Sequence, residues 1–218
     1  MYKYIKPALF KIDPETVHDL ALSTGEFLGK NYLGRFITNV LYGRAPQQAF
    51  KKVDNITYTS PVILSAGFDY DGRLTRILPY LGFGGMEIGS TTALPCRGNN
   101  GKHLTRLPGD KSILVNKGLK NKGVDILIDK LINIPREPNF VIGISIARTN
   151  CLESSTIQSG INDYVYSLKK LSNKNIGDYY TINISCPNSH TGETFASPNL
   201  DNKGPKIKID ARIFLTTS

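Results

Sequence analysis

Apolar residues recur at helical spacing in two stretches near the start of the chain. Asp13 and Pro14 open the first helix, because Asp can cap free backbone N–H groups and Pro fits the first helical turn. A second helix is predicted from about 32 to 42, with Gly43 as its end. The pattern therefore predicts a two-helix hairpin. Its apolar faces cover either the protein's own core or a membrane surface.

After residue 50 the pattern changes to short apolar runs separated by helical stripes. The runs predict strands at about 62–66, 85–90, 140–146 and 179–185. The stripes predict helices at about 74–81, 124–132 and 157–171, the first of them shortened by Pro79. Residues 56–60 alternate like a half-buried strand, and 91–122 are predicted to be a loop. Strands alternating with helices indicate an α/β fold with a parallel sheet.

Small and polar residues follow the first two predicted strands at their carboxyl ends, where parallel α/β folds bind ligands. The first strand runs into Ala66 and Gly67, which would let a flat ligand approach the backbone. The second runs into Ser90, Thr91 and Thr92, whose hydroxyls could bind a ligand's polar edge. Each feature also has a structural explanation, namely a tight turn for Gly67 and helix capping for the hydroxyls.

The fourth predicted strand ends in a segment with reactive chemistry, Asn183-Ile-Ser-Cys186-Pro-Asn188. Asn offers both a donor and an acceptor to a planar imide or carboxylate ligand. A cysteine on a loop can act as a nucleophile or, once ionised, as a base. A lone cysteine is more often an inert buried residue, but two amides flanking Cys186 favour a binding site here.

The amino-acid composition and charge exclude some classes of protein and favour others. The chain has 27 Lys and Arg residues against 18 Asp and Glu residues, a formal net charge of +9, which favours anionic partners. Without a basic run or rings interleaved with basic residues, nucleic acid is not a predicted partner. Neither a disulfide framework nor a metal site is predicted from the scattered Cys96, Cys151, Cys186, His18, His103 and His190. A cytoplasmic location is the default expectation, since neither a signal-peptide core nor a run of about 18 apolar residues is visible.

Five segments, taken in order, resemble the dihydroorotate dehydrogenase family. They are 4–15, 60–69, 82–90, 116–123 and 183–188. The first is similar to the N-terminal extension of the membrane-associated, quinone-dependent class, and the last to the family's active-site motif. The resemblance covers about residues 4 to 200.

The resemblance implies a TIM-type (β/α)8 barrel with FMN at its carboxyl-end mouth. It implies oxidation of dihydroorotate to orotate in pyrimidine (UMP) biosynthesis, with Cys186 removing the C5 proton and a hydride passing from C6 to FMN. The residues it implies for FMN are Ala66, Gly67, Ser90, Ser145 and Asn183. Those it implies for the substrate are Tyr70, Asn116, Asn183 and Asn188.

The chain departs from the quinone-dependent class at three of these positions. Cys186 stands where that class carries Ser, and a Cys base is typical of the soluble class. The electron acceptor, a quinone or another oxidant, is therefore left open. Tyr70 stands where the class has Lys, which leaves orotate specificity open, and Ser145 stands where it has Asn.

The resemblance, together with the length and the strand count, predicts three regions. They are a hairpin at 1–44, the first half of an FMN-binding barrel at 45–200, and a divergent tail at 201–218, where alternation at 207–213 favours one strand. A full barrel takes about 250 residues, so the expectation is a barrel truncated to about its first four βα units. Open sheet edges predict self-association.

Two alternatives to an active dehydrogenase stay open. The chain could be an inactive remnant of that enzyme, or a basic module that binds nucleic acid or acidic lipid. The segment 1–44 is expected to contact the inner face of the cell membrane peripherally.

Overall fold

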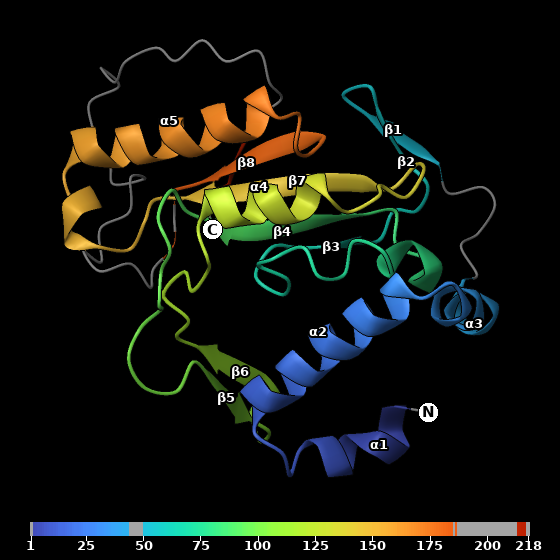
Figure 1. Ribbon diagram of the computed structural model, residues 1–218. Coiled ribbons are helices and arrows are strands. Elements are labelled where there is room, and N and C mark those ends of the chain that lie inside the picture. The colour runs from blue at the N-terminus through green and yellow to red at the C-terminus, as the bar shows by residue number, and fades with distance from the viewer. Residues whose placement is uncertain (1, 44–49, 185, 187–212, 217–218) are drawn as a thin grey trace.

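A five-stranded parallel sheet forms the centre of the protein (Figure 1). The computed structural model describes residues 2–43, 50–184, 186 and 213–216. The strands, in spatial order, are β3 (Ile63–Leu64), β4 (Gly85–Thr91), β7 (Val141–Ala147), β8 (Tyr179–Asn183) and β9 (Ile213–Thr216). Every neighbouring pair is parallel. The prediction of an α/β fold with a parallel sheet is therefore confirmed.

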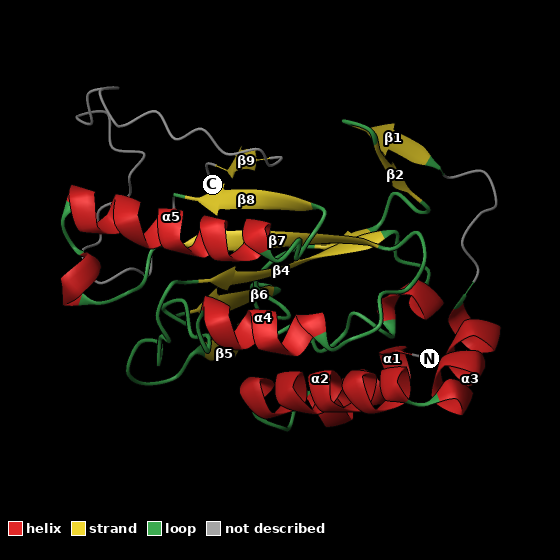
Figure 2. Ribbon diagram, turned by 45° about the horizontal axis from the view of Figure 1, so that its top comes forward, coloured by secondary structure: helices red, strands yellow, loops and turns green. Residues whose placement is uncertain are grey.

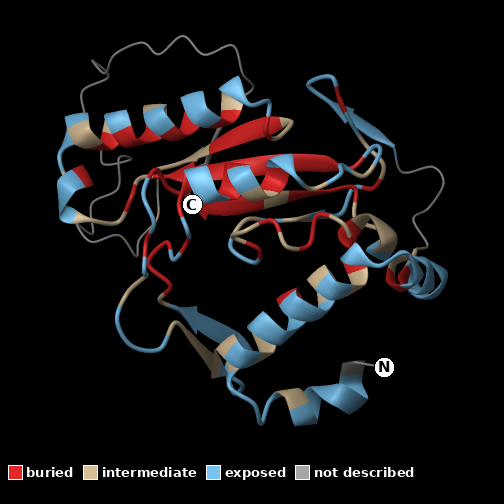
Figure 3. Ribbon diagram, viewed as in Figure 1, coloured by how far each residue is buried: buried red, intermediate tan, exposed pale blue. Residues whose placement is uncertain are grey.

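Two helices pack on one face of this sheet and bury the main core (Figure 2). They are α4 (Val124–Ile132) and α5 (Ile157–Asn173), both near their predicted bounds. Alternate strand residues point toward them, so the core combines the two elements. Its fully buried members include Met86, Ile88, Ile144, Ile146, Val124 and Leu171. Figure 3 shows β4, β7 and β8 buried along most of their length.

Three helices precede the sheet and are mostly exposed (Figure 3). They are α1 (Tyr2–Leu9), α2 (Pro14–Lys30) and α3 (Tyr32–Tyr42). The predicted hairpin is present as α2 and α3, and the predicted cap is confirmed, because Asp13 Oδ1 accepts hydrogen bonds from the backbone N–H groups of Glu15 and Thr16. Helix α1 was not predicted from the apolar pattern. Leu22 of α2 belongs to the main core, which anchors the hairpin to the sheet domain.

A short antiparallel hairpin covers the amino ends of β7 and β8. It consists of β1 (Lys51–Val53) and β2 (Ile56–Tyr58), joined by Asp54 and Asn55 at φ values of 47° and 64°. Asp and Asn tolerate this left-handed region better than most residues. Ile56 packs against Val141 and Tyr179. This hairpin leaves the opposite, carboxyl ends of the strands for the candidate site.

The prediction of a loop over 91–122 was wrong in part. This segment contains a second antiparallel hairpin, β5 (Leu104–Leu107) and β6 (Ser112–Val115). Its two apolar runs are only four residues long and lie between Gly- and Asn-rich stretches, which obscured them. The helix predicted at 74–81 is reduced to the 3-10 turn η1 (Leu78–Leu81), consistent with Pro79 inside it. A second 3-10 turn, η2 (Leu152–Ser154), precedes α5.

The predicted strands differ from the observed ones mainly in their bounds. β3 spans two residues only, since the chain beyond it turns so that Gly67 N–H donates to the carbonyl of Gly89. The strand predicted at 207–213 lies outside the described residues except for Ile213, where β9 begins and pairs with β8. Among the helices of the described residues, none is long and apolar enough to cross a membrane.

Candidate active site at the carboxyl ends of the strands

Three polar side chains from neighbouring strands meet at the carboxyl end of the sheet. Ser90 Oγ of β4 lies 2.7 Å from Ser145 Oγ of β7. Asn183 of β8 donates its amide Nδ2–H to Ser90 Oγ at 3.0 Å. Both serines are buried, with 6% and 2% of their surface exposed. Residues predicted from separate strands to line one ligand are thus hydrogen-bonded to one another.

The loop after β3 is joined to the same cluster through the backbone. Gly67 N–H donates to the carbonyl of Gly89 at 2.8 Å, and Gly89 N–H donates to the carbonyl of Asp69 at 3.1 Å. Gly67 has φ of +100°, and a Cβ built on it would have no atom within 4 Å. Ala66 and Gly67 therefore lie beside Ser90 and leave an open backbone surface, as expected for a flat ligand.

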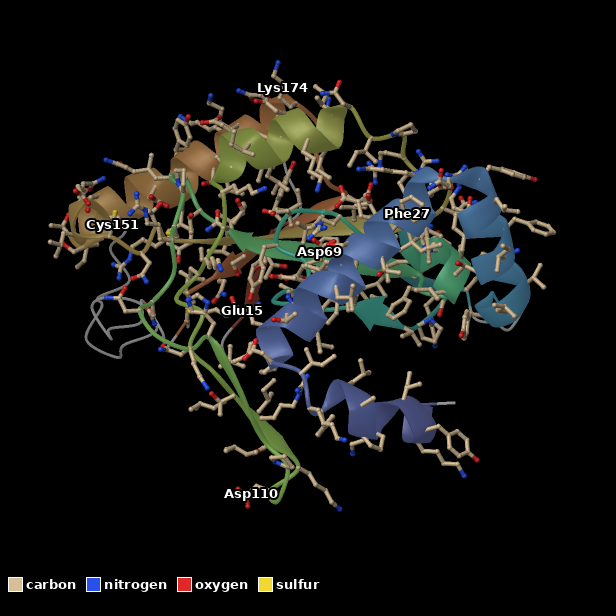
Figure 4. All side chains as sticks on the ribbon, turned by 60° about the horizontal axis from the view of Figure 1, so that its bottom comes forward. Glu15, Phe27, Asp69, Asp110, Cys151 and Lys174 are labelled. Atoms are coloured by element: carbon tan, nitrogen blue, oxygen red, sulfur yellow. The ribbon has the colours of Figure 1, made fainter. Side chains whose placement is uncertain are left out.

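Asp69 holds the loop that follows β3 in place. Its carboxylate is fully buried and accepts hydrogen bonds from the backbone N–H groups of Asp71 and Leu74, at 3.2 and 2.7 Å. Burial raises the pKa of Asp69, although these N–H groups oppose the rise. Figure 4 shows Asp69 beneath α2. The neighbouring Tyr70 is thereby held on a fixed backbone.

Tyr70 interacts electrostatically with Cys186, and its ring packs against a lysine. Burial raises the pKa of Tyr70 to about 12, and the nearby Cys186 and Glu15 add to the rise, so the hydroxyl stays neutral. Lys117 Nζ lies 4.8 Å from the centre of the Tyr70 ring. Cys186 itself is half-buried. Asn188, the other predicted member of this motif, lies outside the described residues.

Asn116, predicted to hold the substrate, belongs to an amide network with Asn99 and Asn150. Its Oδ1 accepts a hydrogen bond from Asn99 Nδ2 at 2.8 Å. Asn150, which follows β7, donates to Asn99 Oδ1 at 3.4 Å and to the carbonyl of Gly118 at 3.1 Å. Among the described residues no hydrogen bond of Asn116 joins it to Ser90, so the structure places the predicted residues in two separate sets.

Sequence reasoning missed two residues of this loop. Asn121 donates to Thr92 Oγ1 and to the carbonyl of Leu119, both at 2.8 Å, and accepts from Gly123 N–H at 2.7 Å. It thereby ties the loop to the end of β4. Lys117 is buried although it is a loop lysine. No pattern in the sequence distinguishes Lys117 from an exposed lysine.

The start of α2 is connected to the same loop by charged side chains. Glu15 Oε1 lies 2.8 Å from His103 Nδ1 and 3.3 Å from Lys120 Nζ. The hydrogen bond from His103 and the charge of Lys120 hold the pKa of Glu15 below its usual value, against the effect of burial. Figure 4 shows Glu15 at the first turn of α2. The N-terminal hairpin therefore forms one wall of the site region.

Parallel strands with polar side chains at their carboxyl ends define an α/β protein of the type that binds ligands at the mouth of a barrel. Within that class the comparison of sequences is decisive: this chain belongs to the dihydroorotate dehydrogenase family, whose model matches residues 49–203. The resemblance noted from the five segments is confirmed.

Curated relatives agree with this assignment. A protein named dihydroorotate dehydrogenase (quinone) from Shewanella frigidimarina is 30% identical over 188 residues, 86% of this chain and 52% of the relative. One of the same name from Alkalilimnicola ehrlichii is 32% identical over 189 residues, 87% of this chain and 52% of the relative. The chain thus spans about half the length of the curated relatives it matches.

Solved structures show the same fold. The dihydroorotate dehydrogenase of Eimeria tenella in complex with ferulenol matches with a TM-score of 0.68 at 25% identity, covering 83% of this chain and 46% of that one. Its ligand-free form matches with a TM-score of 0.66 at 26% identity and covers 83% and 48%. The predicted TIM-type barrel family is confirmed, with the described sheet corresponding to part of such a barrel.

Proposed function

We propose that this chain acts in the FMN-dependent oxidation of dihydroorotate to orotate, a step of pyrimidine (UMP) biosynthesis. The observation that carries the proposal is the cluster of Ser90, Ser145 and Asn183 at the carboxyl ends of adjacent strands. Membership of the family supports the reaction type. The chain spans about half the length of its relatives. Their activity is therefore stated for this chain as a proposal.

The described residues fit the ring system of FMN. Two buried hydroxyls and one amide supply neutral donors and acceptors, which suit the polar edge of an uncharged ring. The open backbone at Gly67 offers a flat surface beside them. Ala66, Gly67, Ser90, Ser145 and Asn183 would hold the ring. When bound, FMN supplies the acceptor for the hydride.

The chain's own residues handle the proton and the orientation of the substrate. The Cys186 thiolate takes the proton from C5 of dihydroorotate, the hydride leaves C6, and a C5=C6 double bond forms. The amides of Asn116, Asn183 and Asn188 orient the carboxylate and the pyrimidine edges. Tyr70, whose hydroxyl stays neutral, offers the substrate an uncharged hydrogen-bonding group. These roles follow from the family motif together with the placement of Tyr70 near Cys186.

A quinone is the acceptor that we propose for regenerating the oxidised flavin. The curated relatives are named for a quinone, and α2 and α3 present apolar side chains at their surface. The exposed members are Leu20, Phe27, Tyr32, Leu33, Phe36, Ile37, Val40, Leu41 and Tyr42. Lys30, whose side chain is 70% exposed, lies among them and suits anionic headgroups. This surface supports peripheral membrane contact of the N-terminal helices.

The visible absorbance spectrum tests the proposal directly. The purified chain is mixed with FMN, freed of excess flavin, and then treated with dihydroorotate without oxygen. Retention of about one flavin per chain, followed by bleaching, is the expected result. Retention without bleaching would leave a flavin-binding protein that lacks the reaction. A chain that retains no flavin would instead be the inactive remnant.

A further inference from the structure

Tyr164, a buried tyrosine of α5, links the carboxyl ends of two strands of the sheet. Its hydroxyl donates a hydrogen bond to the backbone carbonyl of Asn183, the last residue of β8, at 2.7 Å. The same hydroxyl accepts one from the backbone N–H of Arg148, which directly follows β7. Tyr164 is 9% exposed and belongs to the main core, so packing and two hydrogen bonds together fix its hydroxyl.

Asp163, the residue before Tyr164, secures the same edge of the sheet. Its Oδ1 accepts a hydrogen bond from the backbone N–H of Thr149 at 3.0 Å, and its carboxylate accepts another from the backbone of Ala93, two residues beyond β4. Asp163 is also 9% exposed. Two adjacent side chains of one helix therefore hold the backbone at the carboxyl ends of β4, β7 and β8. Figure 1 shows α5 lying along this sheet.

The three strands held in this way carry the neutral cluster of the candidate site. Ser90 lies on β4, Ser145 on β7 and Asn183 on β8. Asn183 joins the two sets of contacts, because its carbonyl accepts from Tyr164 while its side-chain amide donates to Ser90. The direction of a side-chain amide depends on the backbone that carries it, so the Tyr164 hydroxyl acts on the amide through one peptide.

We propose that Tyr164 is a positioning residue of the candidate site, whose hydroxyl orients the Asn183 amide toward Ser90 and the flavin. The inference rests on the proposed function. Packing of α5 explains a ring at position 164 but not a hydroxyl, since phenylalanine would fill the same space. The proposed base, Cys186, follows Asn183 by three residues. Its charge adds to the rise in the pKa of Tyr164, so the same hydroxyl also lies within electrostatic reach of the base.

Tyr180 is a matched control within the same chain. It is 5% exposed, belongs to the same core and donates its hydroxyl to the carbonyl of Ile176 at 2.8 Å. Burial raises the pKa of both tyrosines to about 12. Tyr180 lies near the amino end of β8, whereas Tyr164 acts at the carboxyl end. Tyr164→Phe and Tyr180→Phe should therefore lower the midpoint of urea unfolding by comparable amounts and differ only in their effect on the site.

Alkylation of Cys186 by iodoacetamide, followed by peptide mass spectrometry, tests the inference on the full chain without flavin. Cys186 is half-buried, so its labelling rate reports how firmly this strand end is held. Tyr164→Phe should raise the rate by about three- to tenfold, the effect of losing one hydrogen bond, and Tyr180→Phe should leave it unchanged.

Fluorescence titration and the visible spectrum of bound FMN give the second reading. Tyr164→Phe should weaken FMN binding by about three- to tenfold and shift the visible absorption band of the bound flavin, because the Asn183 amide loses its fixed direction. Tyr180→Phe should retain the wild-type affinity and spectrum.

The other outcomes separate the inference from the proposed function. If both variants change Cys186 labelling and FMN binding equally, the Tyr164 hydroxyl serves stability alone and the inference fails. If Tyr164→Phe changes neither, the hydroxyl positions nothing and the inference fails as well, while the proposed function survives. If the wild type retains no FMN but Tyr164→Phe still labels faster at Cys186 than Tyr180→Phe, the proposed function fails and the hold of Tyr164 on this strand end stands.

Discussion

Tyr179 donates a hydrogen bond from its hydroxyl to Glu87 Oε2, at 3.2 Å, across the backbone of Gly143. The strand register places the three residues in one row, with Glu87 opposite Gly143 and Gly143 opposite Tyr179. The row lies on the sheet face opposite α4 and α5. Burial raises the pKa of Glu87, and burial together with the charge of Glu87 raises the pKa of Tyr179. Glycine at the middle position is what lets the ring reach across.

Gly143→Ala should destabilise the protein. A Cβ at this position would lie 2.1 Å from Cζ of Tyr179, so the ring must leave its place and the bond to Glu87 is lost. We expect a loss of about 1–3 kcal/mol in the free energy of unfolding, measured by urea denaturation. Gly109→Ala is the control, because a Cβ there has no neighbour within 4 Å. Equal stabilities of the two variants would contradict the packing argument.

Glu87→Gln should change how stability depends on pH. A pKa raised in the folded state means that ionising Glu87 costs stability, so this contribution is present at acid pH and is lost as pH rises through the folded pKa. Gln stays neutral and can still accept from Tyr179. The variant should therefore gain stability relative to the wild type as pH rises from about 4, the usual carboxylate pKa, through the raised pKa of Glu87. A difference that stays constant over this range would show that Glu87 is not destabilised by burial.

Ser90→Ala should cost more than Ser145→Ala. Ser90 Oγ is hydrogen-bonded to both Ser145 and Asn183, so its removal takes one hydrogen bond from the buried Ser145 and one from the half-buried Asn183. Removal of the Ser145 hydroxyl leaves the bond between Asn183 and Ser90 intact. We expect Ser90→Ala to lower the free energy of unfolding by about 2 kcal/mol and Ser145→Ala by about 1 kcal/mol. FMN affinity, measured by fluorescence titration, should fall more for Ser90→Ala than for Ser145→Ala. The reverse order would indicate that the three side chains do not act as one cluster.

Cys186→Ala and Cys186→Ser separate the proposed base from a structural role. Alanine should slow bleaching of the bound flavin by dihydroorotate by about a hundredfold or more. Serine should retain part of the rate, with its pH profile moved upward, because a hydroxyl ionises at higher pH than a thiol. Cys151→Ala, a half-buried cysteine whose Sγ donates to Ser154, should leave bleaching unchanged. Identical profiles for Cys186→Ser and the wild type would exclude Cys186 as the base.

Charges on α3 should weaken binding to anionic vesicles. Phe36 and Val40 are 53% and 61% exposed, so Phe36→Asp with Val40→Asp should not affect folding. Each apolar side chain withdrawn from lipid costs about 1.5–3 kcal/mol, which predicts at least about a tenfold loss in a sedimentation assay. The control is Leu152→Asp, an apolar residue that is 68% exposed outside the N-terminal helices. Equal losses for both variants would mean that the N-terminal helices are not the membrane surface.

The elements that sequence reasoning found are those with long apolar periodicity. The stripe of Val124, Leu127, Ile128 and Leu131 predicted α4 within its observed bounds, because burial against the sheet requires that spacing. The hairpin of β5 and β6 was missed, since its residues are mostly exposed and no core selects their pattern. Helix α1 escaped notice for a similar reason, being exposed at most of its positions.

The residues of the candidate site likewise divide into those that the sequence predicted and those that it did not. Ser90, Ser145 and Asn183 could be predicted as neighbours, because parallel strands bring their carboxyl ends to one edge. The burial of Lys117 could not be predicted, because it depends on how the loop after β6 packs against Tyr70 and the start of α2. Contacts between residues 47 positions apart and in irregular segments leave no periodic signal in a sequence.

The bridge from Glu15 to His103 and Lys120 also sets an order of folding. Its partners are separated by 88 and 105 residues, so α2 cannot complete these contacts until Lys120 has been synthesised. Long-range contacts of this kind form late, after local helices and adjacent strands. During translation Leu22, the buried core residue of α2, is therefore exposed before the sheet can receive it. A lipid surface or a chaperone that binds this hairpin would meet it first as a nascent segment, ahead of the folded domain.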